Sequence, residues 1–280
     1  MQLDLLRLSL LQRGQGDLFS GLEWSNLVPP AREKWLRSMF SDTLSFQHRG
    51  DVFHYVPEPD APDSPIILGR IGRQLIVREN EPPESGLHET SREAWRAVRV
   101  FIDPTHHDDG QKVAIEEDGA IGRPKALLES LATSINSRSP PEPYVIEVAA
   151  IVDPETFWDF VAANTGEITV VEFEFIAPNM FGGEEFLDQE LRAMKENEKV
   201  RKATLKLENS DGGLQPNTDR IAEAVKYATR GGGTVKAKTR KKKSYNSARK
   251  VKRVTVPEAA LAENIADLVR LIIDKVFKTR

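Results

Sequence analysis

The sequence predicts an α+β protein, in which helices pack on one or more mixed sheets and a basic β-hairpin precedes a terminal helix. Three observations support this fold class. Over the second half of the chain, apolar runs with strand periodicity alternate with amphipathic runs of helical periodicity. Polar segments rich in Pro and Gly separate these runs. The chain has 280 residues, 39% hydrophobic and 29% charged, which is typical of a folded protein with one or two cores.

Individual elements follow from the spacing of apolar residues. The clearest strand covers residues 168–176, where Phe173 and Phe175 alternate with Glu172 and Glu174. The other predicted strands cover residues 51–56, 97–102, 112–116, 144–152 and 203–207, and the predicted helices cover residues 30–39, 125–135, 154–163, 184–198, 218–229 and 258–277. Polar, proline-containing loops are expected at 57–65 and 80–91.

Composition breaks predict the domain organisation. We expect an N-terminal α/β region over residues 1–95 and an α+β domain over residues 96–280 that contains the basic hairpin. The linker-like string NSRSPPEP at 136–143 marks a second candidate boundary. No internal repeat supports a solenoid or a tandem array.

The composition also excludes several classes of site. The chain has no cysteine, which excludes disulfides, zinc–thiolate sites, iron–sulfur clusters and thiol nucleophiles. Asp4 and Arg7 interrupt the first apolar run, so we interpret it as a first strand or helix and not as a signal peptide. No apolar run is long enough for a membrane span. We therefore expect a cytoplasmic protein with no membrane partner and no cofactor.

Basic residues are concentrated in one short segment. Between Lys236 and Arg253 the chain has ten Lys or Arg and no Asp or Glu, which leaves 29 basic against 43 acidic residues elsewhere. We expect a hairpin with strands at 234–240 and 250–256, a basic turn at 241–248, and a Gly231–Gly233 segment that lets the arm pivot or lets backbones approach closely. Such an arm could contact several phosphates at once.

The candidate nucleic-acid-binding residues are therefore the cations of this segment and one aromatic ring. They are Lys236, Lys238, Arg240, Lys241, Lys242, Lys243, Tyr245, Arg249, Lys250, Lys252 and Arg253. Tyr245 would supply a stacking ring, and the neighbouring Asn246 and Ser247 would supply hydrogen-bond donors. The alternative is a solvated charged loop that balances the acidic body or docks on an acidic partner.

A second candidate site follows the strand predicted at 97–102. Asp103, His106, Asp108 and Asp109 lie within seven residues; their carboxylates could hold a hard divalent metal, and histidine could act as a base. The same string is also a polar turn built from Pro, Asp and Gly, and this interpretation is favoured.

Two further patterns are weaker. Glu172 and Glu174 share one face of a strand and could suit a metal, but the nearest E-x-K string, at 196–199, falls at a predicted helix end. Residues 69–73, GRIGR, could hold phosphate, yet they lack the Lys-Ser/Thr of a P-loop and are more typical of a strand and turn.

Three strings carry a family resemblance: VFIDPTHH at 100–107, FEFIAPN at 173–179, and the glycine-rich turn before Ala-Lys at 231–238. Over about 95–250 the chain resembles an uncharacterised family of bacterial anti-phage defence proteins, distantly similar to the RexA and KwaB families. The resemblance implies an intracellular, dimeric DNA-binding protein that acts in defence or abortive infection. It carries over no catalytic residue.

The leading hypothesis is a non-enzymatic nucleic-acid-binding component of an anti-phage system, with DNA favoured as the ligand. The alternatives are a metal-dependent nuclease that uses the cluster at 103–109, and an adaptor that joins other subunits of a defence complex. A homodimer built on the terminal helix fits all three hypotheses.

Overall fold

The computed structural model describes residues 1–13, 30–58, 64–105, 107, 110–176, 193–194, 197–198, 200, 202–257 and 265–278. Within these residues, helices pack on two separate sheets, which confirms the α+β class. Every strand pair within the two sheets is antiparallel. None of the described helices combines the length and the apolar character needed to cross a membrane.

The larger sheet is built around the N-terminal strand. Its strands are β1 (Gln2–Gln12), β2 (Leu44–His48), β3 (Asp51–Pro57), β4 (Ile67–Asn80), β5 (Glu89–Ile102), β6 (Gln111–Glu116), β7 (Tyr144–Ala150) and β12 (Arg253–Thr255). One edge of β1 pairs with β6, and the other edge pairs with β7 and then β12. The boundary expected at residue 95 therefore falls inside β5, and the segments on either side of it share one sheet.

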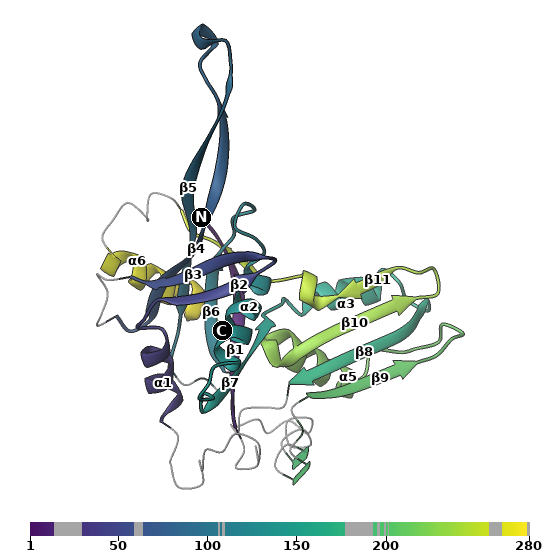
Figure 1. Cartoon of the computed structure of the whole chain (residues 1–280). Helices are drawn as coiled ribbons and strands as arrows, with labels where there is room; N and C mark the ends of the chain where they lie inside the picture. The colour runs from purple at the N-terminus through teal and green to yellow at the C-terminus, as the bar shows by residue number, and fades with distance from the viewer. Residues whose placement is uncertain are drawn as a thin grey trace.

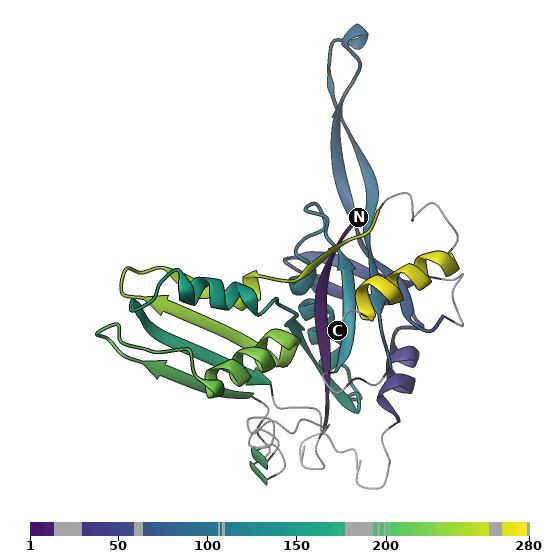
Figure 2. The ribbon, with the colours of Figure 1, turned by 180° about the vertical axis from the view of Figure 1, so that it is seen from behind.

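Strand β1 is buried on both faces, which explains its almost unbroken apolar sequence. Leu6, Leu8 and Leu10 join the core under α1 (Arg32–Met39) and α2 (Pro124–Asn136). Leu3 and Leu5 point to the opposite face, where they share a core with α6 (Ile265–Ile272). Figure 2 shows α6 beside β1 on this side of the sheet. The terminal helix thus covers part of the sheet.

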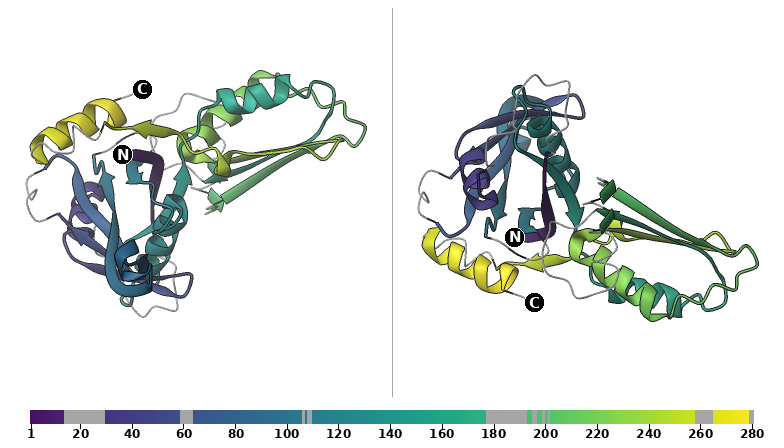
Figure 3. Two further views of the ribbon diagram at one scale, coloured as in Figure 1. Left: turned by 90° about the horizontal axis from the view of Figure 1, so that it is seen from above. Right: turned by 90° about the horizontal axis from the view of Figure 1, so that it is seen from below.

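The smaller sheet has the order β11 (Ser244–Asn246), β10 (Gly233–Thr239), β8 (Ile168–Ile176) and β9 (Lys202–Glu208). Helices α3 (Glu155–Ala162) and α5 (Asp219–Tyr227) lie on one face of this sheet (Figure 3). Its opposite face is lined by polar and charged side chains. The chain passes between the two sheets at 151–154 and 250–252, so the structural division lies there and not at the expected 136–143 boundary.

Strands β4 and β5 extend beyond the larger sheet as a long two-stranded ribbon, which we call the arm, residues 73–96 (Figure 1). Strand β3 pairs with β4 only as far as Gly72, and β6 pairs with β5 only from Val100. The sequence predicted a loop over 80–91. Instead, β4 continues to Asn80, β5 begins at Glu89, and a short 3-10 turn over Pro83–Ser85 lies in the tip between them.

Candidate nucleic-acid interface

The three glycines before the basic segment fix the base of β10. Gly231 has φ +91, and a Cβ atom there would lie 2.9 Å from the Cβ of Arg7 in β1. A Cβ on Gly233 would lie 1.9 Å from the carbonyl oxygen of Glu174 in β8. The glycines are therefore required for close approach of backbones, and the alternative role as a pivot is not needed to explain them.

The expected first strand of the hairpin is present as β10, but the return strand is β11 at Ser244–Asn246, so the return strand expected at 250–256 is wrong. The β10–β11 pair closes through a turn at 240–243, in which the Thr239 amide donates to the Lys243 carbonyl over 3.0 Å. A 3-10 turn at Ser247–Arg249 follows β11. Strand β12 then pairs with β1 in the larger sheet. The sequence could not predict this switch, because a three-residue strand carries too little periodicity to identify its partner.

Tyr245 is part of the core between the smaller sheet and its helices α3 and α5, so it is not available as a stacking ring. Its side chain is 5% exposed and makes edge-to-face and tilted contacts with Phe157 and Phe160. Its hydroxyl shares a 2.8 Å hydrogen bond with the hydroxyl of Thr156, and burial raises its pKa. Because the four-residue turn sets the register, Tyr245 points inward opposite Ala237.

The neighbouring polar residues also serve the fold. Ser247 is buried and its Oγ accepts a 2.9 Å hydrogen bond from the amide of Val235. The Asn246 side chain accepts a 3.0 Å bond from the amide of Ala248 and so caps the 3-10 turn. Their predicted role as donors to a ligand is therefore replaced by a structural one.

Four of the ten cations are paired with carboxylates. Lys236 lies 3.0 Å from Glu172 across the β10–β8 pair. Arg240 and Lys241 lie 3.6 and 3.2 Å from Glu167, and the hydrogen bond from Lys241 is the main reason that the pKa of this glutamate is lowered. Arg253 pairs with Asp4 in β1 at 3.0 Å and with Glu117, just after β6, at 2.8 Å.

The other six cations form no ion pair with any residue that the structure describes, and all six are exposed; the charge of Lys238 still contributes to the lowered pKa of Glu172. They are Lys238, Lys242, Lys243, Arg249, Lys250 and Lys252, which we call the free cations. They lie on β10, in the turn that leads into β11, and after β11, which is the edge strand of the smaller sheet. Lysines at such an edge also prevent strand-to-strand association. The result is a positive edge on a chain whose remainder is acidic.

The polar face of the smaller sheet is nearly neutral by comparison. Glu172 and Glu174, the candidate metal pair of this strand, lie near lysines: Lys236 at 3.0 Å and Lys202 at 3.9 Å, respectively. The hydrogen bond from Lys236 is the main cause of the lowered pKa of Glu172. Among the described residues, no group of three or more His, Asp or Glu side chains has a geometry that could hold a metal.

A groove of about 380 Å³ lies where this polar face meets α2 and β7 of the larger sheet. Its walls come from α2, β7, β8, β9 and β10, and Lys202 reaches across it to Glu147 at 3.5 Å. Sequence patterns gave no sign of this groove, since its polar and apolar wall residues come from elements far apart in the chain.

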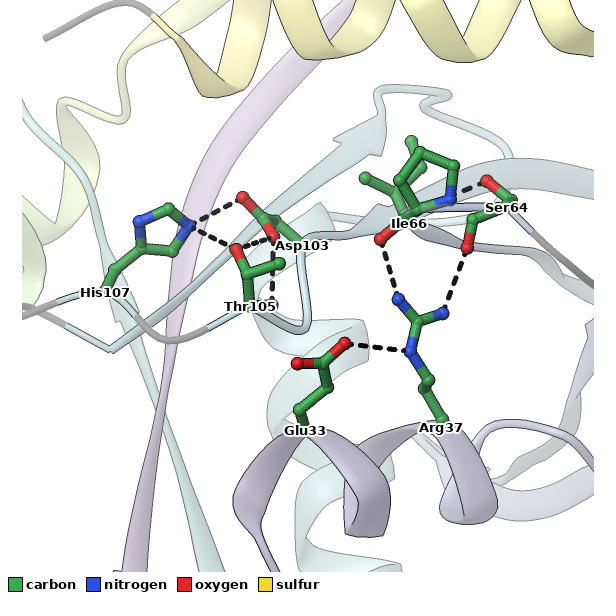
Figure 4. A network of polar contacts seen from close by, with 8 residues as sticks. Glu33, Arg37, Ser64, Ile66, Asp103, Thr105 and His107 are labelled. Carbon is green, nitrogen blue, oxygen red and sulfur yellow. Dashed lines mark hydrogen bonds and ion pairs between the residues drawn. The ribbon is translucent and has the colours of Figure 1, made fainter.

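Asp103 begins a polar turn, as the favoured interpretation predicted (Figure 4). One carboxylate oxygen accepts hydrogen bonds from the amide and hydroxyl of Thr105, at 3.0 and 2.5 Å. The other lies 2.6 Å from Nε2 of His107, and the Thr105 hydroxyl lies 3.1 Å from that same nitrogen. These contacts link residues 103, 105 and 107 and so close the turn. His106, Asp108 and Asp109 lie outside the described residues.

The GRIGR string is part of strand β4 and does not form a phosphate loop. A Cβ on Gly69 would overlap the ring of Tyr55, at 2.4 Å, so glycine is required for packing of the core. Arg70 and Arg73 point to Glu58 and Asp51, with which they form ion pairs. They do not supplement the basic edge.

No protein-family model matches this chain, and no curated protein or solved structure is found to be similar to it.

Proposed function

We propose that the protein binds nucleic acid, with DNA favoured, through phosphate contacts made by the free cations along the β11 edge. The observation that carries the proposal is the contrast in pairing. Six exposed cations lack a carboxylate partner among the described residues, although the chain as a whole has a net charge of −4. An exposed cation without an internal partner can replace the counterions of a phosphate backbone, and release of those counterions drives binding.

This geometry favours binding that depends little on sequence. None of the free cations lies on a described α-helix, the element that most often enters a groove, and the single aromatic ring of the segment is buried. If all six cations contact phosphates of duplex DNA, the logarithm of the binding constant should fall with the logarithm of salt concentration with a slope of about −5.

The biological setting of the proposal is a bacterial anti-phage or abortive-infection system. It rests on the resemblance of residues 95–250 to a defence family and on the basic edge. A protein that grips nucleic acid without cleaving it could sense or shield phage DNA during infection.

The test is binding of the purified chain to labelled duplex DNA, single-stranded DNA and RNA across a salt series, with and without magnesium. A triple variant, Lys238→Ala, Lys242→Ala and Lys243→Ala, should reduce the salt slope by about 3 units, because each of the three lysines would otherwise neutralise one phosphate. The matched control removes three exposed cations that do have carboxylate partners, through Lys206→Ala, Arg270→Ala and Lys278→Ala.

Each outcome separates one hypothesis from the others. Equal weakening by both triple variants would show that net charge, and not the β11 edge, governs binding. Cleavage of the substrate with magnesium would replace the proposal with the nuclease. An absence of binding at low salt would make the basic edge a docking site for an acidic protein, as the adaptor hypothesis requires.

A further inference from the structure

Exposed large apolar side chains gather on one face of the larger sheet. The described residues include five of them: Val52 (48% exposed), Val56 (47%), Ile76 (72%), Leu87 (54%) and Trp95 (66%). The register pairs His54 with Gly72, Gln74 with Trp95 and Ile76 with Glu93. Because side chains alternate along a strand, all of these except Leu87, at the tip of the arm, point to the same side.

This face is only partly covered by the protein itself. Leu68 and Phe101 lie on the same side of β4 and β5, and α6 buries them. Beyond them no described helix covers the face, which continues over β3 and along the arm. On the opposite side of the same strands, Phe53, Ile71 and Val98 are fully buried. The uncovered face, which we call the strip, runs from the body of the sheet onto the arm, and on it the exposed apolar side chains lie among polar and ion-paired residues such as Gln74 and Arg70.

The arm itself needs a partner for stability. From Arg73 to Asn80 it is paired only within the ribbon, over a length of about 27 Å. An isolated two-stranded ribbon is marginally stable in water, because it buries little apolar surface. Burial of Ile76 and Trp95 against another surface would supply the missing stabilisation.

The charges of the arm indicate what that partner is. Residues 73–96 contain four Arg and five Glu, so the arm is almost neutral. On the face that carries Ile76 and Trp95, the arginines of β4 and β5 each have a carboxylate partner: Arg70 with Glu58, Arg78 with Glu89 and Arg99 with Glu116. A surface with paired charges of both signs does not attract a polyanion. It does suit an identical surface, since a two-fold contact places the same patch against itself.

We propose that this face docks a second copy of the same chain around a two-fold axis, with the arm of each copy on the sheet of the other. Ile76 and Trp95 of one copy then cover Val52 and Val56 of the other, and the two sheets pack face to face. The base of the strip, over β2 to β5, and the twisted arm together present an area on the order of 600 Å² (Figure 1). Side chains raise the accessible area toward the roughly 800 Å² that each partner buries in a stable dimer.

The first experiment measures the mass of the full chain by light scattering from micromolar to hundred-micromolar concentration. The expected mass is twice the 31.4 kDa of one chain. Ile76→Glu and Trp95→Glu on the arm, and Val52→Glu on the sheet, should each raise the dimer dissociation constant by about 100-fold, because each buries a charge in the contact. A mass of one chain throughout would overturn the proposal.

Val77→Glu is the matched control, because Val77 is adjacent to Ile76 but points to the other face of the arm. It should leave the dimer intact. Dissociation by Val77→Glu, or a dimer that survives all three substitutions, would refute the assignment to this face. Circular dichroism of each variant shows whether it has folded.

Tryptophan fluorescence gives a second reading that does not depend on a disruptive variant. The emission of Trp95 should shift to shorter wavelength as the concentration rises and its ring leaves water, and Trp95→Phe should abolish that shift. The dimer proposal and the nucleic-acid-binding proposal are tested independently, because the arm variants leave the free cations unchanged.

Discussion

The arm and the β11 edge are both exposed hairpins rich in basic residues, yet their charges are arranged in opposite ways. On the arm, Arg73, Arg78, Arg92 and Arg96 each lie beside a carboxylate, and the exposed residues between them include Ile76 and Trp95. On the β11 edge, six cations have no ion pair with a described residue, and the aromatic ring is buried. The first pattern suits a protein surface, and the second suits a polyanion.

The difference shows that a count of basic residues is a poor guide to function by itself. An arginine that already has a carboxylate partner gains little from a phosphate, because the first pair must be broken. An exposed lysine without such a partner loses only its counterion and some side-chain entropy. Pairing within the fold therefore decides which basic segment can act on nucleic acid.

The most severe test of this contrast removes the free cations as a set. Replacement of all six by alanine should weaken DNA binding by at least about 100-fold near 100 mM salt, because a surface without these six charges releases few counterions from the phosphates. Fluorescence anisotropy with labelled duplex measures the effect. Removal of Arg78 and Arg92 from the arm should leave the affinity unchanged, and an equal weakening there would end the distinction between the two hairpins.

A second prediction concerns the base of the β11 edge. Gly233→Ala should reduce the free energy of unfolding by about 3 kcal/mol, because the added Cβ would overlap the Glu174 carbonyl and force β10 away from β8. Urea unfolding measures this change. Gly119→Ala is the control, since a Cβ there meets nothing within 4 Å and should change the stability little. A stable Gly233→Ala protein would mean that β10 can shift without cost.

Arg253 belongs to the basic segment in sequence but to the larger sheet in structure, so it should affect stability and not binding. Burial raises the pKa of Asp4, and the charge of Arg253 opposes that rise. Arg253→Ala leaves the buried carboxylate with less compensation and should cost about 2 kcal/mol near neutral pH, a value reduced because Arg253 is half-exposed.

The pH dependence of the stability loss caused by Arg253→Ala tests the ion pair with Asp4. The pKa of folded Asp4 lies above its value in the unfolded chain, and the substitution raises it further. The folded state then binds the proton more tightly, so acidification through the raised pKa stabilises it. The deficit of Arg253→Ala relative to the natural chain should therefore be largest at pH 7 and shrink toward pH 4. A deficit that grows on acidification would contradict the assigned pair.

The sequence predicted the smaller sheet better than the larger one, for physical reasons. Strand β8 has one buried and one polar face, so Phe173 and Phe175 alternate visibly with glutamates. Strand β4 has no such signal over the arm, where both faces are largely in water and the ribbon protrudes from the core. The periodicity of apolar residues follows their burial within the chain, so a ribbon that is mostly exposed to water gives a weak pattern.

The candidate site was predicted in composition but not in geometry. The ten cations are evident in the sequence, whereas their pairing depends on residues far away, such as Glu167 for Lys241 and Asp4 for Arg253. The inward position of Tyr245 follows from a turn of four residues, while the sequence suggested a turn of eight. In the expected hairpin Tyr245 was a turn residue, whereas in the structure it is a strand residue of β11 on the inward face.

The smallest predicted effect lies within the turn itself and separates binding from stability. Lys242 has φ +63, a left-handed conformation that disfavours a side chain with a Cβ. Lys242→Gly should therefore raise the free energy of unfolding by about 1 kcal/mol. It should also lower the salt slope of DNA binding by about 0.9, because one phosphate is no longer neutralised. Lys243→Ala is the control, and it should lower the slope equally without the gain in stability. If Lys242→Gly stabilises the protein and leaves the slope unchanged, Lys242 does not touch a phosphate, and the DNA-binding surface begins at Lys243. A gain in the free energy of unfolding together with a loss of salt slope would mean that the strained Lys242 contributes charge to binding at a cost in stability.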